Sequence, residues 1–366
     1  MISYRLYGPV KGGIIFLDSS QLIEKPIERY PGATVACFDP TRGDLPRRWL
    51  DEARTVAFLE RLGELGVEGV LVASSTGQGH LRTVAELEAW FLCAAGARIP
   101  ETVRMALLRP EDGVAANAGL LDLLAGAGYP VVFLRPGTNL PADAGTEQVT
   151  DNLAPLIEAA ASRGLAIGLY SIPDVSGLPL TAEAAARLCA VPGGDHIVAV
   201  KITEADYEAS TARFLAHPGI KHLKIVQGWD PHLGRALREG PDYDEKGRQR
   251  VGITSGLMSL AVYQYFHILD AAAGEDWDEM TQAQQAVTRL FNAMQDDPAQ
   301  FADLQRAKYI MGLGQPLVGT VKDDQVERIF TALRDLPRQD DRRRLARSLD
   351  LMKDGPFHAR LSELAQ

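Results

Sequence analysis

Short apolar runs rich in β-branched residues alternate with longer amphipathic stretches along most of this chain. Short runs bounded by turn residues are typical of buried strands, whereas apolar residues three or four positions apart indicate helices. The runs that we interpret as strands cover residues 34–38, 69–73, 103–107, 130–134, 166–170, 197–201, 222–226 and 251–254. The pattern therefore predicts eight strand-then-helix units.

Helix signals lie between these runs. Residues 49–66 have apolar positions near helical spacing. Thr83 and Glu86 stand three positions apart, which is the spacing of a capping box, and Thr181 is another candidate helix start. Further helices are expected near residues 113–126 and 147–163. A helix after each strand is the connection that a parallel sheet requires.

Eight consecutive units favour a closed (β/α)8 TIM barrel, which is an α/β fold. An open doubly wound sheet is the alternative, but no glycine-rich dinucleotide turn follows the first predicted strand. We predict an N-terminal extension over residues 1–32, the barrel over 33–275, and a C-terminal helical appendage over 276–366 that packs on the barrel. An apolar stripe from Trp277 to Met294 indicates the first helix of that appendage.

Charge and cysteine content narrow the range of partners. The 366 residues carry a formal net charge of −10, which argues against binding to nucleic acid or to an anionic membrane surface. Cys37, Cys93 and Cys189 are widely spaced, so neither a zinc site nor a disulfide framework is indicated. No apolar run reaches the ~18 residues of a membrane span, and the N-terminus lacks a signal pattern. We expect a cytoplasmic protein without a bound metal.

Two polar side chains stand where predicted strands end, which in a barrel is the end that carries catalytic groups. Lys201 closes an apolar strand, where desolvation would disfavour its ammonium form and free the amine to attack a carbonyl. From position alone, a lysine that reaches solvent is the alternative. Tyr170 ends the preceding strand. Its hydroxyl could transfer protons, or its ring could cap the hydrophobic core while the hydroxyl forms a hydrogen bond. Lys224 also interrupts an apolar strand, but no other signal accompanies it.

A turn of small polar residues follows the second predicted strand. Ser75, Thr76 and Gly77 offer hydroxyl and backbone N–H groups just before a helix, and such an arrangement suits a carboxylate. Small polar residues are also common in ordinary turns. The corresponding positions after the fourth and eighth strands hold Arg135, Thr254 and Ser255.

Three segments together resemble one family. Residues 74–78 (Ser-Ser-Thr-Gly-Gln) resemble the G-[ST]-T-G-E motif of the dihydrodipicolinate synthase and N-acetylneuraminate lyase superfamily. Residues 170–177 resemble its Y-N-x-P-x-x-[ST]-G motif, and residues 197–201 its I-x-G-[IV]-K motif. The order and spacing of the motifs agree, and the similarity extends from about residue 33 to about residue 310.

This resemblance implies a role for each motif residue. Lys201 would form a Schiff base with pyruvate or a related 2-oxo acid, and Tyr170 would shuttle protons. Ser75 and Thr76, with backbone N–H groups, would hold the carboxylate, and residues 252–255 would line the same pocket. Because the imine acts as the electron sink, such chemistry needs neither a metal nor an organic cofactor. The resemblance also implies a homotetramer or homodimer.

Departures from the motifs argue against dihydrodipicolinate synthesis itself. In that branch an arginine two residues after the motif's proline binds the second substrate, and here Val175 occupies that position. Many members carry a Tyr-Tyr pair after the fourth strand, where this chain has residues 134–138 (Leu-Arg-Pro-Gly-Thr). Gln78 replaces the first motif's Glu, and Ser171 replaces the second motif's Asn.

Two functions from different classes remain. The first is a lyase or aldolase, which retention of Lys201 and Tyr170 favours. The second is a non-catalytic relative that binds a 2-oxo acid in a degenerate site, which loss of the Tyr-Tyr pair keeps open. Arg135 could hold an anionic group of a second substrate through its two-donor fork, or it could form an ion pair with a neighbour such as Asp143.

Overall fold

Eight parallel strands form a closed barrel in the computed structural model, which describes residues 4–7, 14–17, 19–39, 50–240, 249–295 and 302–366. The strands follow one another in chain order around the barrel, and the last pairs with the first. They are β3 (Gly32–Thr34), β4 (Gly69–Val72), β5 (Val103–Leu108), β6 (Val131–Leu134), β7 (Ala166–Ser171), β8 (Ile197–Ile202), β9 (Lys224–Gln227) and β10 (Val251–Ser255). The predicted barrel is confirmed, and the open doubly wound sheet is wrong.

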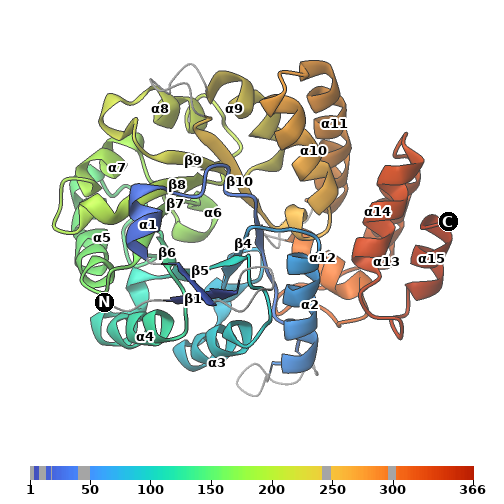
Figure 1. Cartoon of the computed structure of the whole chain (residues 1–366), viewed down its shortest axis with the longest axis horizontal. Coiled ribbons are helices and arrows are strands. Elements are labelled where there is room, and N and C mark those ends of the chain that lie inside the picture. The colour runs from blue at the N-terminus through green and yellow to red at the C-terminus, as the bar shows by residue number, and fades with distance from the viewer. Residues whose placement is uncertain (1–3, 8–13, 18, 40–49, 241–248, 296–301) are drawn as a thin grey trace.

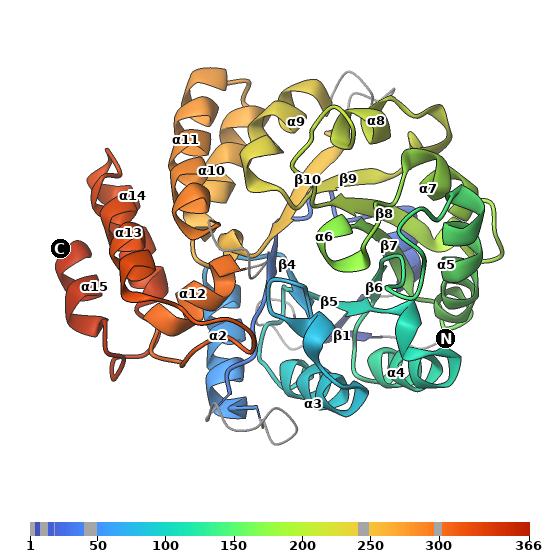
Figure 2. The ribbon, with the colours of Figure 1, turned by 180° about the vertical axis from the view of Figure 1, so that it is seen from behind.

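Helices surround the barrel, as Figures 1 and 2 show. They are α2 (Glu52–Glu64), α3 (Val84–Ala95), α4 (Val114–Gly126), α5 (Thr146–Ala161), α7 (Ala182–Leu188), α8 (Thr211–Ala216), α9 (Leu233–Glu239) and α10 (Val262–Ala273). The Thr83 hydroxyl accepts from the Glu86 N–H, and the Glu86 carboxylate accepts from the Thr83 N–H. The predicted capping box is therefore confirmed, as is Thr181 at the start of α7.

Two predicted strands differ from the structure by two residues or more at a boundary, whereas the other six agree to within one residue. The first strand spans Gly32–Thr34 rather than 34–38, although the Val35 N–H still donates to Leu71 O. Gly32 follows a proline and resembles a turn signal, but its lack of a side chain suits the pairing with Thr254. A Cβ on Gly32 would lie 2.8 Å from the Thr254 Oγ1 atom. The seventh strand begins at Lys224, two residues later than predicted.

The barrel interior is filled by a cluster of buried apolar side chains. Its members include Leu71, Met105, Leu107, Phe133, Tyr170, Val198 and Val226. Gly168 makes room for this filling, because a Cβ there would lie 2.4 Å from the Phe133 ring. A second and larger cluster lies between the strands and the surrounding helices. A filled interior leaves the ends of the strands as the places where polar side chains can gather.

The segment before the barrel contributes to that interior. β1 (Tyr4–Tyr7) pairs with β2 (Ile14–Leu17) in an antiparallel ribbon, and α1 (Ser19–Glu24) follows. Leu22 on α1 and Tyr30 before β3 belong to the interior cluster. The short α6 (Pro173–Ser176), after β7, lies over the middle of the barrel in Figure 2.

The chain after the barrel is helical, as predicted. It forms α11 (Trp277–Met294), α12 (Ala302–Ile310), α13 (Asp323–Arg334), α14 (Gln339–Leu349) and α15 (His358–Leu364). Of the predicted stripe on α11, the side chains of Met280, Val287 and Met294 are buried. Figure 1 shows α12 beside α2 and α13 to α15 farther from the barrel axis. In the described part of the chain, no helix combines the length and hydrophobicity needed to cross a membrane.

Candidate active site

Lys201 and Tyr170 meet at the carboxyl ends of β8 and β7. The parallel register places Tyr170 opposite Lys201. The Lys201 Nζ atom donates to the Tyr170 hydroxyl at 2.6 Å and lies 3.3 Å from the Thr203 Oγ1 atom. The two hydroxyls are 3.1 Å apart, so three polar groups form a closed triangle. Lys201 and Tyr170 are each 2% exposed, which excludes the alternative of a lysine that reaches solvent.

Thr203 is a member of this group that the sequence analysis missed. It stands two residues after the lysine, and alternation along a strand places positions i and i+2 on the same side. Gly228, in the loop after β9, leaves the space beside both groups. A Cβ on Gly228 would lie 3.1 Å from the Lys201 Nζ atom and 2.0 Å from the Thr203 Oγ1 atom. Any side chain at position 228 would therefore displace the amine or the hydroxyl.

The turn after β4 is folded tightly against its surroundings. A Cβ on Gly77 would lie 2.2 Å from Val35 O, and a Cβ on Gly79 would lie 2.0 Å from Ala73 O. Both positions therefore require glycine. The Gly77 N–H points at the Ser74 hydroxyl at 3.3 Å. These contacts bring the backbone of the turn close to the ends of β3 and β4.

The turn presents groups suited to a carboxylate. Within the described part of the chain, the buried Ser75 hydroxyl has no hydrogen-bond partner. None of the described groups accepts from the backbone N–H groups of Ser75 and Thr76 either. The Thr76 hydroxyl contacts the hydroxyls of Thr34 and Ser74. Buried donors without an acceptor carry a free-energy penalty that a bound anion would remove.

The predicted residues of β10 are already engaged with the protein. The Thr254 hydroxyl donates to Tyr30 O at 3.1 Å. The Ser255 hydroxyl accepts from the Leu257 N–H at 3.0 Å and lies 3.5 Å from the Tyr265 hydroxyl. Of the two, Ser255 belongs to a buried network with Tyr265 and Asp230.

Asp230 is a buried carboxyl group that the sequence analysis missed. It accepts from the Tyr265 hydroxyl. Burial raises the pKa of Asp230, while its hydrogen bonds with Ser255 and Tyr265 and the charge of Lys201 act in the opposite direction. Asp230 is thus electrostatically coupled to the lysine. Its sequence signal is faint, because an aspartate before proline in a loop resembles an ordinary helix start.

Arg135 is fully buried and forms an ion pair with Glu111 rather than with Asp143. It also donates to Pro136 O at 2.8 Å, and among the described residues its Nε atom has no acceptor. His80 lies close by. Burial, followed by the charges of Arg135 and Arg109, lowers the pKa of His80 to about 4. The loop after β6, where many members of the resembled family carry Tyr-Tyr, is therefore built here around a buried arginine.

Two departures from the family motifs have local explanations. The Ser171 hydroxyl donates to Glu204 at 2.5 Å and accepts from the Leu180 N–H at 2.9 Å. Burial raises the pKa of Glu204, and its bond to Ser171 opposes that shift. The Gln78 side-chain amide makes two hydrogen bonds to the backbone of the C-terminal region. Its oxygen accepts from the Leu317 N–H, and its nitrogen donates to Val318 O. An ionised glutamate could only accept.

Lys224 lies at the opposite end of the barrel from Lys201, because it is the first residue of β9. Its Nζ atom donates to Gln249 O at 2.9 Å. This position agrees with the absence of any other signal for Lys224. Among the described residues, no group of three or more His, Cys, Asp or Glu side chains could hold a metal ion.

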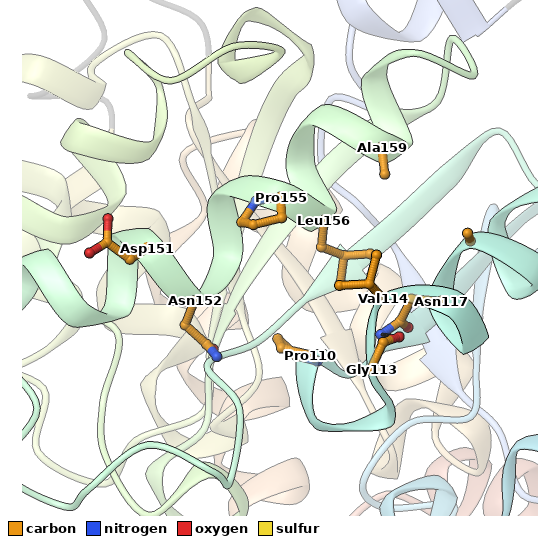
Figure 3. Close-up of a pocket in the computed structure, with 10 residues that line it drawn as sticks. Pro110, Gly113, Val114, Asn117, Asp151, Asn152, Pro155, Leu156 and Ala159 are labelled. Atoms are coloured by element: carbon orange, nitrogen blue, oxygen red, sulfur yellow. Dashed lines mark hydrogen bonds between the residues drawn. The ribbon is translucent and has the colours of Figure 1, made fainter.

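A cavity of about 260 Å³ lies outside the barrel, between α4 and α5 (Figure 3). Its lining is mainly apolar and includes Val114 on α4 and Pro155 and Leu156 on α5. None of the residues predicted for the active site lines it.

Comparison with known proteins points to the family that the motifs indicated. No protein-family model matches the chain. The chain is 29% identical over 216 residues to 4-hydroxy-tetrahydrodipicolinate synthase from Xylella fastidiosa. That match covers 57% of this chain, and the chain spans only 63% of the length of that relative.

Solved structures share the barrel. A prophage protein of the dihydrodipicolinic acid synthase family from E. coli K12, in complex with pyruvate, superposes with a TM-score of 0.69 at 16% identity, covering 84% of this chain and 98% of that one. N-acetylneuraminate lyase from Fusobacterium nucleatum gives a TM-score of 0.66 at 15% identity, covering 85% and 99%. At these identities the structures support the fold. The sequence match and the three ordered motifs make the chain similar to the dihydrodipicolinate synthase and N-acetylneuraminate lyase superfamily.

Proposed function

We propose that this protein is a Schiff-base-dependent lyase or aldolase that acts on pyruvate or a related 2-oxo acid. The observation that supports this most directly is the buried contact of 2.6 Å between the Lys201 amine and the Tyr170 hydroxyl. An amine that attacks a ketone must lose protons, and the oxygen of the ketone must gain them before it leaves as water. A hydroxyl in contact with the amine is suited to carry those protons.

In this proposal the Lys201 amine attacks C2 of the 2-oxo acid and forms a carbinolamine. Tyr170, relayed by Thr203, protonates the leaving hydroxyl, water departs, and the imine remains on Lys201. The imine then withdraws electrons from the adjacent carbon, which permits cleavage or formation of a bond there. Ser75, Thr76 and Gly77 hold the carboxylate, while Thr254 and Ser255 line the pocket.

In this proposal, the second substrate differs from the one that dihydrodipicolinate synthesis uses. Val175 packs against the cluster inside the barrel that includes Tyr170. It contributes an apolar surface where the lysine-biosynthesis branch has an arginine. We also propose that the protein assembles as a homotetramer or homodimer, which sedimentation equilibrium would test.

Borohydride trapping tests the proposal. Pyruvate and borohydride together should add one reduced adduct, located by peptide mapping on the peptide that carries Lys201. Lys201→Ala should abolish the adduct, and Lys224→Ala should leave it intact. An adduct that persists in Lys201→Ala, or that maps to Lys224, would disprove the role of Lys201. The non-catalytic alternative predicts trapping or binding of a 2-oxo acid without turnover of any aldehyde partner or sugar acid in a panel.

A further inference from the structure

The turn that follows β4 contains two residues in a backbone conformation that side chains disfavour. Ala73 has a φ of 61° and Gln78 a φ of 58°, and neither is glycine. Such left-handed residues persist only where the surrounding structure holds them. Within the turn, the Gln78 N–H donates to Ser75 O and the Gly79 N–H donates to Ser74 O. The turn is therefore held partly by its own backbone hydrogen bonds and partly by contacts from outside.

The outside contacts come from the chain beyond the barrel. Gln305 on α12 donates to Thr76 O at 2.9 Å. The Leu317 N–H donates to the Gln78 side-chain oxygen at 2.7 Å, and the Gln78 amide donates back to Val318 O at 3.4 Å. Gln78 and Gln305 are both buried, so water does not readily replace these bonds.

An ion pair strengthens the same junction. The Lys308 Nζ atom, on α12, lies 3.2 Å from an oxygen of Asp39, which follows β3. Arg82, just after the turn, lies 3.0 Å from the same oxygen. All three side chains are buried. α12 is thus fixed to the loops after β3 and β4 next to the turn.

We infer that Gln78 and Gln305 are positioning residues through which the C-terminal region holds the turn after β4 in the shape that binds the carboxylate of the 2-oxo acid. This inference rests on the proposed function. It also gives the Gln78 departure a reason, because an amide can bind both backbone groups of the 317–318 segment. Loss of either glutamine should weaken carboxylate binding and leave the chemistry at Lys201 largely unchanged.

The test uses Gln78→Leu and Gln305→Leu in the full chain, with Gln315→Leu as the matched control. Gln315 binds the N–H and the carbonyl oxygen of Val321, so its amide makes the same pair of bonds within the C-terminal region and without touching the turn. Two readouts are compared. The first is the pyruvate concentration that gives half-maximal borohydride trapping. The second is hydrogen exchange of the peptide that covers the turn, which needs no activity.

For Gln78→Leu and Gln305→Leu we expect the half-saturating concentration to rise about three- to tenfold. The trapping rate at saturation should stay within about twofold, and the amides of the turn should exchange faster. Gln315→Leu should show neither change. Unaltered exchange and half-saturation in both test variants would overturn the inference, as would equal effects in all three. Failure of the wild-type chain to trap any 2-oxo acid would refute the proposed function, whereas the exchange readout would still decide the role of the glutamines.

Discussion

The Lys201 amine and the Tyr170 hydroxyl oxygen lie 2.6 Å apart because β7 and β8 pair in register at these two residues. The same register sets Thr203 within hydrogen-bond distance of both groups. A one-residue slip between the strands would turn the lysine to the other face of the barrel wall. The chemistry that we propose therefore depends on strand pairing as much as on residue type.

Tyr170→Phe should slow turnover far more than it destabilises the fold. Removal of one proton-transfer group typically lowers a rate by about 10²–10⁴-fold, whereas loss of one hydrogen bond lowers the free energy of unfolding by about 1 kcal/mol. Single-turnover trapping rates and urea unfolding would measure the two effects. Thr203→Val, which removes the other hydroxyl, is the comparison. Normal trapping by Tyr170→Phe would assign the tyrosine to the core alone.

The protein should fail to condense pyruvate with aspartate semialdehyde at a useful rate. Val175 supplies no cation, and a charged hydrogen bond to a carboxylate is worth roughly 1.5–3 kcal/mol. A coupled assay for dihydrodipicolinate, run beside the pyruvate-trapping assay on the same sample, would measure this. Robust product formation, or rescue of a strain that lacks the step, would contradict the prediction.

Arg135→Leu should destabilise the protein by about 3 kcal/mol, because it leaves the partly buried Glu111 carboxylate without its partner. Arg135→Leu combined with Glu111→Leu should recover much of that loss, since removing both charges avoids an unpaired one. Thermal unfolding of the two single variants and the double variant would show the coupling.

A second substitution of Arg135 distinguishes its two possible roles, which are substrate binding and the ion pair with Glu111. Arg135→Lys retains the charge and loses the two-donor fork. If the arginine binds substrate, the KM for anionic partners should rise while pyruvate trapping on Lys201 stays intact. If the ion pair with Glu111 is its whole role, only stability should change. The buried position of the guanidinium favours the second outcome.

His80 should make stability depend on pH. Its pKa falls from 6.5 in the unfolded chain to about 4 in the folded protein, so the unfolded chain binds more protons between these values. The contribution of neutral His80 is therefore complete above about pH 6.5 and is lost as the pH drops toward 4, by roughly 3 kcal/mol in total. His80→Gln should flatten the pH dependence of urea unfolding in this window. The control is His217→Gln, and an equal slope in both variants would contradict the assignment.

Local patterns predicted the parts of the fold that depend on local physics. The capping box at Thr83 was predicted correctly, and the strand that carries Lys201 was predicted to within one residue, because each depends on residues within a few positions. The first strand was placed too late, since Gly32 reads as a turn residue unless the Thr254 side chain opposite it is known. Boundaries set by a distant neighbour are not visible in a local pattern.

The candidate site, too, contains residues that local patterns could predict and residues that only the folded chain brings together. The triangle of Lys201, Tyr170 and Thr203 follows from strand order and alternation, so its first two members could be predicted. The partner of Arg135 could not, because Glu111 is 24 positions away and lies in a different loop. Asp230 is coupled to Lys201 only through packing of the loop after β9. Long-range polar contacts of this kind need the folded chain.

Because the chain is synthesised from its N-terminus, the turn after β4 is made well before the C-terminal residues that contact it. Thr76 and Gln305 are 229 positions apart, and Gln78 and Leu317 are 239 apart. At a translation rate of about 5–20 residues per second, roughly 10–50 s pass between the two ends of these contacts. The strands of the barrel can pair during this interval, while Ala73 and Gln78 have yet to be held in their left-handed conformation. A nascent chain would thus acquire its barrel first, and the turn that we propose as the carboxylate site would reach its final shape only after residue 318 has left the ribosome.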